Sequence, residues 1–120
     1  MKYRESEEMY LETILLLKQT QKTVRSIDIA NNLGYSRASV SRAISLLKQR
    51  NYIVINNSLI EFTDEGFKRA NEIYERHSVI TEVLQKIGVP EILAEDNACR
   101  IEHVVTPELL EYFKKFINVK

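Results

Sequence analysis

Three side chains with metal-ligand chemistry fall within five residues near the end of the chain: Cys99, Glu102 and His103. They lie in a segment, residues 90–105, whose pattern predicts one helix. Positions i, i+3 and i+4 of a helix share a face, so these side chains would point the same way. A thiolate, a carboxylate and an imidazole are common ligands of a transition metal ion. From these residues alone, a buried cysteine beside a surface Glu-His pair is an equally good interpretation, because short patterns often match by chance.

The composition is that of an ordinary globular protein of 120 residues, long enough for one core or for two small subdomains that share one. Three glycines and two prolines favour helices over a turn-rich all-β fold. The longest apolar run, residues 14–17, is too short to span a bilayer, and the first residues lack a signal-peptide pattern. A single cysteine excludes an internal disulfide and fits a reducing compartment, so we expect a cytoplasmic protein with no membrane association.

Basic residues are concentrated in the first half, although the formal net charge is zero. Between residues 22 and 58, six basic residues accompany a single acid, Asp28, whereas acids outnumber bases after residue 58. The distribution of charge matters more than its sum, and this one favours nucleic-acid binding by the first half.

The first predicted helix, residues 5–19, carries two further candidate ligands, Met9 and Glu12, one turn apart. Its apolar residues are Met9, Leu11, Ile14, Leu15 and Leu17. Its charged residues, Glu7, Glu8, Glu12 and Lys18, are distributed around the remainder. Taken singly, Met9 is more simply a core residue and Glu12 a solvated charge.

Residues 26–49 have the pattern of a helix-turn-helix. Ser26 is predicted to cap a short helix, residues 27–33, which Gly34 ends, and Ser36 to cap a second helix that runs to about residue 49. The second helix contains no acid between residues 36 and 47. Because arginine binds guanine bidentately and serine contacts phosphates or base edges, we predict a recognition helix rather than a solvated face. The predicted DNA-binding residues are Ser26, Ser36, Arg37, Ser39, Ser41, Arg42 and, in the wing described next, Asn57.

A predicted hairpin follows, with strands at residues 52–55 and 59–62 around an Asn-Asn-Ser turn. A hairpin directly after a recognition helix is the wing of a winged helix. Thr63 is then predicted to cap a long helix that continues to about residue 87 and carries His77 midway. Pro90 at N1 begins the helix that carries Cys99, and Thr106 caps a final helix from Pro107.

We therefore predict a mainly α protein with two domains. Residues 1–63 would form a winged helix-turn-helix DNA-binding domain with a two-stranded wing, and residues 64–120 a helical dimerisation and metal-binding domain. The last two helices carry more apolar residues than one neighbouring helix can cover, which indicates a homodimer.

Two segments resemble a known family: Glu8-Met9-Tyr10-Leu11 and Ala98-Cys99-Arg100-Ile101-Glu102-His103-Val104. They are similar to segments of the diphtheria-toxin-repressor and manganese-transport-regulator family of metal-dependent winged-helix repressors, and to its iron-dependent branch more than its manganese branch. The resemblance covers nearly the whole chain. It implies a repressor of metal-homeostasis genes that binds a palindromic operator as a homodimer when one or two Fe²⁺ or Mn²⁺ ions occupy each subunit. The chain would be a member that lacks the SH3-like third domain.

The resemblance also implies the ligands. The primary site of the iron-dependent branch maps onto Met9, Cys99, Glu102 and His103, and a second site onto His77 and, in manganese-type members, Glu12. Thr81 and Glu95 replace a carboxylate and a histidine of the iron-dependent branch. The second site is therefore either a manganese-type arrangement of Glu12, His77 and Glu102, or absent. Soft thioether and thiolate ligands favour Fe²⁺ over Mn²⁺.

Two other functions compete with this one. The first is a winged-helix regulator without metal dependence, in which Cys99 is structural or redox-sensing. The second is an enzyme with Cys99 as nucleophile and His103 as base, but no orienting group is evident and the helix-turn-helix would be unexplained. We therefore do not expect an enzyme.

Overall fold

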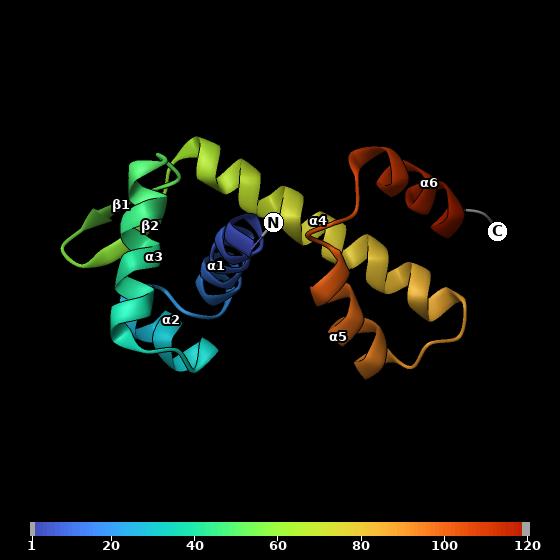
Figure 1. Ribbon diagram of the computed structural model, residues 1–120, viewed down its shortest axis with the longest axis horizontal. Coiled ribbons are helices and arrows are strands. Elements are labelled where there is room, and N and C mark those ends of the chain that lie inside the picture. The colour runs from blue at the N-terminus through green and yellow to red at the C-terminus, as the bar shows by residue number, and fades with distance from the viewer. Residues whose placement is uncertain (1, 119–120) are drawn as a thin grey trace. The chain divides into compact units, whose positions relative to one another are not determined.

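The computed structural model describes residues 2–118, with the side chains of residues 7–118. Its elements, in chain order, are α1 (Lys2–Thr20), α2 (Ser26–Leu33), α3 (Arg37–Gln49), β1 (Ile53–Asn56), β2 (Leu59–Phe62), α4 (Asp64–Lys86), α5 (Glu91–Ile101) and α6 (Pro107–Ile117) (Figure 1). The chain forms two compact units, here called the N-terminal and C-terminal units, which divide between Asn71 and Glu72 within α4. The mainly α winged-helix prediction is confirmed.

The helix-turn-helix forms largely through the predicted local signals. Gly34 ends α2 in the left-handed conformation (φ 71°), which costs glycine little. Ser36 caps α3, because its Oγ accepts a hydrogen bond of 3.1 Å from the backbone N–H of Ser39. The predicted cap at Ser26 is wrong. α2 begins at Ser26, and its N-cap is Arg25, whose backbone N–H donates to the Asp28 carboxylate at 2.8 Å.

The wing is an antiparallel hairpin that begins one residue later than predicted. Asn56 pairs with Leu59, so Asn57 and Ser58 alone form the turn. Both have positive φ, 51° and 68°, as a type I′ turn requires. The backbone N–H of Ile60 donates to the Val24 carbonyl at 2.8 Å and thereby joins the hairpin to the segment before α2.

α4 begins at the predicted cap. The Thr63 hydroxyl accepts a hydrogen bond of 3.0 Å from the Gly66 backbone N–H. A Cβ on Gly66 would collide with the backbone carbonyl of Tyr52, so this position requires glycine. The helix start therefore lies directly against the residue that leads into the wing, which fixes the wing relative to α4.

The core of the N-terminal unit is formed by fully buried side chains of α1, α2, α3, the hairpin and the segment between α1 and α2. Its largest members are Leu11, Ile14, Val24, Ile29, Val40, Leu47, Ile53 and Ile60. All of these except Val24 are apolar positions of the predicted helices and strands, so periodicity located most of this core.

The C-terminal unit packs the second half of α4 against α5 and α6. Its core contains Val79, Ile80, Ala98, Val105 and Leu110. Thr106 caps α6 ahead of Pro107, as predicted. The helix predicted over residues 90–105 is too long at both ends: Pro90 is the N-cap rather than N1, and α5 ends at Ile101. Within the part of the chain that the structure describes, no helix has the length and apolarity needed to cross a bilayer.

Candidate metal centre and nucleic-acid interface

The C-terminal unit places one carboxylate between two imidazoles. Glu102 is fully buried at the C-cap of α5. Its Oε2 lies 2.9 Å from Nδ1 of His77 on α4, and its Oε1 lies 3.4 Å from Nε2 of His103. Oε1 has no hydrogen bond among the groups that the structure describes. Three of the predicted ligands therefore meet within this unit.

Cys99 adds a thiol to this group. Although Glu102 lies beyond the last residue of α5, its backbone is still helical (φ −59°, ψ −25°), so the predicted i to i+3 relation with Cys99 holds. The Cys99 Sγ and a Glu102 carboxylate oxygen lie within 4.8 Å of each other. Cys99 is exposed, whereas the Glu102 side chain is buried.

These residues fit a divalent cation. A buried carboxylate oxygen without a hydrogen bond is costly, because desolvation is not compensated there. A cation beside Oε1 would remove that cost, and thiolate, carboxylate and imidazole together suit a first-row transition metal.

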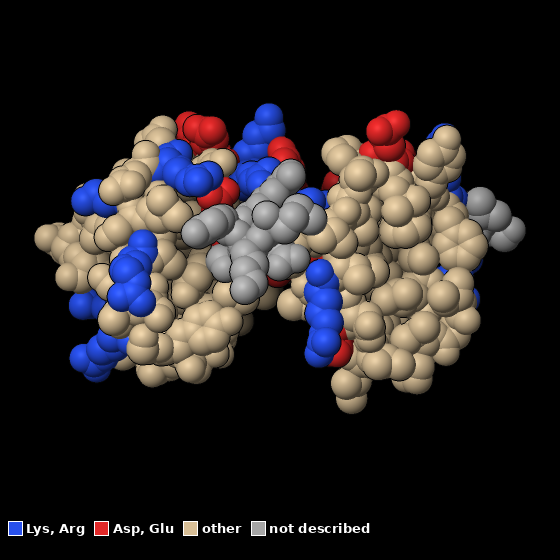
Figure 2. Space-filling view, viewed as in Figure 1, with Lys and Arg blue, Asp and Glu red and all other residues tan. Residues whose placement is uncertain are grey.

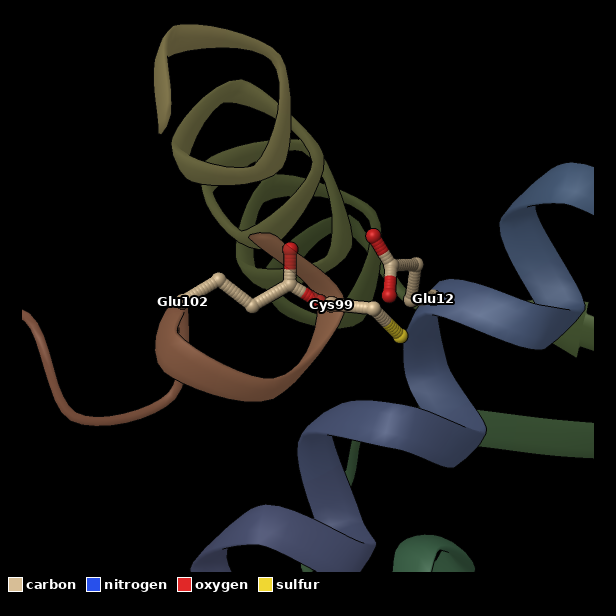
Figure 3. Close-up of side chains that lie close together, drawn as sticks. All are labelled: Glu12, Cys99 and Glu102. Carbon is tan, nitrogen blue, oxygen red and sulfur yellow. The ribbon is translucent and has the colours of Figure 1, made fainter. Parts of the chain in front are cut away.

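α1 carries the two remaining predicted ligands. Figure 3 shows Glu12 on α1, Cys99 on α5 and Glu102 at the C-terminal end of α5. All three side chains are of types that bind metal ions. Met9 is partly buried, and its Sδ accepts a hydrogen bond of 3.8 Å from the Tyr35 hydroxyl. The interpretation of Glu12 as a solvated charge is wrong, because its side chain is buried.

Two neighbouring acids of α1 are also buried, and sequence reasoning missed their role. Glu7 pairs with Arg50 at 2.9 Å, and Glu8 pairs with Arg69 at 2.8 Å. Hydrophobic periodicity places both acids outside the apolar face of this helix. The only local sign of their burial is that two adjacent acids precede an apolar run. Their arginine partners lie more than 40 residues away in the chain.

Aromatic contacts join α1 to the turn before the recognition helix. The rings of Tyr10 and Tyr35 meet edge to face, with centroids 6.3 Å apart. Burial raises the pKa of Tyr10, the neighbouring Tyr35 raises it further, and Arg42 opposes the shift. Tyr10 is therefore neutral at physiological pH.

The predicted DNA-binding residues divide into two groups. Arg37, Ser41, Arg42 and Asn57 are exposed or at the turn tip, and Figure 2 shows basic side chains over α3. The other three already have structural roles or less exposure. The Ser36 hydroxyl caps α3 and donates a hydrogen bond of 3.0 Å to the Ser39 hydroxyl. The Ser39 hydroxyl also accepts a hydrogen bond of 3.4 Å from Arg42. Ser26 is half-buried.

Comparisons with known proteins agree with both halves of this description. Residues 2–58 match the family "Iron dependent repressor, N-terminal DNA binding domain", and residues 63–119 match "Iron dependent repressor, metal binding and dimerisation domain". The chain is 32% identical to the transcriptional regulator MntR of Escherichia coli O6:H1, over 94% of this chain and 74% of that protein. It is 30% identical to the iron-dependent repressor IdeR of Mycobacterium leprae, over 92% of this chain and 49% of that protein.

A solved structure described as a manganese-dependent transcriptional repressor complex with manganese has a TM-score of 0.85 at 22% identity, over 92% of this chain and 52% of that one. The chain thus spans about half the length of IdeR and of this structure. Family matches over both halves, together with the relationship to MntR, establish that the chain belongs to the diphtheria-toxin-repressor family of metal-dependent, DNA-binding transcriptional repressors.

Proposed function

We propose that this protein represses metal-homeostasis genes in the cytoplasm by binding a palindromic operator as a homodimer when Fe²⁺ or Mn²⁺ is bound. The observation that carries the proposal is Glu102, a fully buried carboxylate that contacts two imidazoles and whose Oε1 has no hydrogen bond among the described groups. Because repressors of this family are not enzymes, Cys99 and His103 are not a catalytic pair.

For the primary ion we propose Cys99, Glu102 and His103 from the C-terminal unit and Met9 from the N-terminal unit. Their side chains combine soft sulfur donors with nitrogen and oxygen donors, which favours Fe²⁺ over Mn²⁺ relative to an all-oxygen site. Later metals such as Ni²⁺ and Zn²⁺ bind such sites more tightly, so the choice in the cell depends on availability as well as on affinity.

For any second ion we propose Glu12, His77 and Glu102, with at most two ions per subunit. The contact between His77 and Glu102 supports this set. Thr81, which stands where iron-dependent members have a carboxylate, donates its hydroxyl to the His77 carbonyl at 2.8 Å. Glu95 is exposed. Neither residue is therefore part of the proposed sites.

The proposed ligands come from both units, which suggests how binding is coupled to DNA recognition. A bound ion supplies positive charge that offsets the repulsion among the carboxylates and the thiolate. Without that charge, Glu12 and Glu102 repel each other and the units are loosely coupled. With it, the same carboxylates hold α1 and α5 in one arrangement. In a homodimer this sets the separation of the two recognition helices near one DNA turn, roughly 34 Å. A coupling free energy of about 1–3 kcal/mol would raise operator affinity about 5–150-fold.

The homodimer is supported by apolar side chains that the C-terminal unit leaves exposed. Ile92 on α5 is 86% exposed, Tyr112 on α6 is 67% exposed, and Ile87 after α4 is 63% exposed. Large apolar side chains concentrated in this way are typical of a protein interface. We propose that residues 64–120 form the dimerisation and metal-binding domain and residues 1–63 the DNA-binding domain.

For DNA we propose that Arg37, Ser41 and Arg42 contact base edges or phosphates in the major groove. Ser36 and Ser39 order the first turn of α3 and orient Arg42, and their hydroxyls retain acceptor capacity toward a phosphate. We further propose weaker contacts from Ser26 and from Asn57, because the tip of the wing carries no basic residue.

The test begins with selection of a duplex from a randomised DNA pool by the Mn²⁺-loaded protein. The selected sequence is expected to be palindromic. Its affinity for the protein is then measured by fluorescence anisotropy with Mn²⁺, with Fe²⁺ under anaerobic conditions, and with a chelator. Equal affinity in all three conditions would contradict the proposal.

Glu102→Gln is the decisive variant, because it keeps the shape of the side chain and removes its charge. It should abolish the response to metal yet leave a folded dimer. Glu95→Gln, at an exposed position of α5, is the matched control and should respond like the unmodified protein. A full response in Glu102→Gln would exclude Glu102 as a ligand.

A further inference from the structure

Both ends of the recognition helix are held by residues of one short stretch of α1. At the C-terminal end of α3, the guanidinium of the C-cap residue Arg50 pairs with Glu7 at 2.9 Å. Before the N-terminal end, the hydroxyl of Tyr35 donates to the Met9 Sδ at 3.8 Å. A helix of 13 residues is about 20 Å long. The Arg50 and Tyr35 side chains therefore contact α1 from opposite ends of α3.

The same stretch of α1 is also held to α4. Glu8, between the two residues just named, is fully buried and pairs with Arg69 at 2.8 Å. The Glu7 side chain is buried too, whereas Arg50 is 52% exposed. The carboxylates are thus the fixed partners of these pairs, and the arginines extend from other elements to meet them.

We propose that Glu7 and Tyr35 are positioning residues through which α1 sets the orientation of the recognition helix. The proposal rests on the proposed function, because Met9, the residue that Tyr35 contacts, is a proposed metal ligand. When Met9 and Glu12 bind the metal ion, α1 is displaced. The contacts of Glu7 with Arg50 and of Met9 with Tyr35 then move α3 together with α1. Each of these contacts joins one protein side chain to another, so the proposed effect on DNA binding is indirect.

Removal of the Glu7 charge distinguishes a positioning role from a purely electrostatic one, because the two roles predict opposite changes in affinity for DNA. Glu7→Gln removes a negative charge from the DNA-binding unit and frees Arg50 for a phosphate, so electrostatics alone would strengthen binding to any duplex. Loss of positioning weakens binding only to the duplex whose bases α3 reads. The ratio of affinities for a selected and a scrambled duplex therefore reports positioning, and a loss of folded protein does not change it.

The experiment uses the full chain loaded with Mn²⁺, the duplex that it selects from a randomised pool, and a scrambled duplex of equal length and composition. Glu7→Gln should lower the selected-to-scrambled affinity ratio by about fivefold or more, the lower limit of typical coupling between sites. Its Mn²⁺ affinity without DNA should be unchanged. Glu65→Gln, which removes an exposed acid from the same unit, is the control and should leave the ratio unchanged.

Two further variants complete the test. Exchange of the charges, Glu7→Arg with Arg50→Glu, should recover part of the ratio that Glu7→Arg alone loses. Tyr35→Phe, which removes only the hydroxyl, should lower the ratio through the other end of α3. A ratio in Glu7→Gln equal to that in Glu65→Gln overturns the role of Glu7, and an unchanged ratio in Tyr35→Phe overturns that of Tyr35. The metal response of the unmodified protein, measured alongside, tests the proposed function separately.

Discussion

The buried pair between Glu8 and Arg69 allows a quantitative test of how α1 is held in the N-terminal unit. We predict that Arg69→Met destabilises the protein strongly, although methionine fills much of the same volume. The substitution leaves a fully buried carboxylate without its guanidinium partner. Removal of one member of a buried ion pair costs about 3–5 kcal/mol, mainly because the other charge remains desolvated.

Two features of the structure place this case below that range. The Arg69 side chain is 25% exposed, so water can partly replace the lost partner. Its Nε is buried without a hydrogen bond among the described groups, a cost of about 1–3 kcal/mol that methionine removes. We therefore expect a net loss of about 2–3 kcal/mol. With a urea m-value of about 1–3 kcal/mol per M, the unfolding midpoint should fall by about 0.7–3 M.

Urea unfolding followed by circular dichroism measures this loss, and the preceding residue of α4, Lys68, provides the control. Lys68 is exposed, so Lys68→Met should change the free energy of unfolding by less than about 0.5 kcal/mol. The double variant Glu8→Gln with Arg69→Met should be more stable than Arg69→Met alone, because no buried charge remains. If Arg69→Met is as stable as Lys68→Met, the pair contributes nothing and the reasoning fails.

Three further predictions follow from the fold. Gly66→Ala should lower the free energy of unfolding by about 2 kcal/mol or more, because the added methyl group meets the rigid Tyr52 carbonyl, and an unchanged urea midpoint would contradict this. Ser58→Gly should raise stability by about 0.5–1 kcal/mol in the same assay, because Ser58 holds φ at 68°, and a loss would show that the turn is not strained. Ile92→Ser and Tyr112→Ser should shift the protein toward monomer in sedimentation velocity, whereas a dimer that persists in both variants would locate the interface elsewhere.

Much of the fold could be predicted because its signals are local. Ser36, Thr63 and Thr106 each cap a helix at the predicted residue. Ser26 is not the cap because the Asp28 carboxylate accepts a hydrogen bond from the Arg25 backbone N–H. Arg25 is therefore the N-cap, and Ser26 is the first residue of α2. The excess length predicted for α5 arose from Val104 and Val105. Val104 is exposed, and Val105 reaches the core from the segment between α5 and α6.

The candidate site was predictable only in part. The i to i+3 spacing of Cys99 and Glu102 is a local property, so the sequence reveals it directly. The contact of His77 with Glu102 and the ion pairs of Glu7 and Glu8 depend on tertiary packing between distant segments. Hydrophobic periodicity treats an acid as solvent-facing, and only a partner elsewhere in the fold can reverse that assignment.

The exposed thiol of Cys99 has a practical consequence. It is the only cysteine in the sequence, so an alkylating reagent would modify the protein at one defined atom. A thiolate that ligates a metal is shielded from such reagents, whereas the free thiolate is the reactive nucleophile. The rate of Cys99 alkylation would therefore report how much of the metal site is occupied, and the assay needs neither DNA nor a coloured ion. Storage without a reductant would oxidise the same atom and gradually produce a population unable to respond.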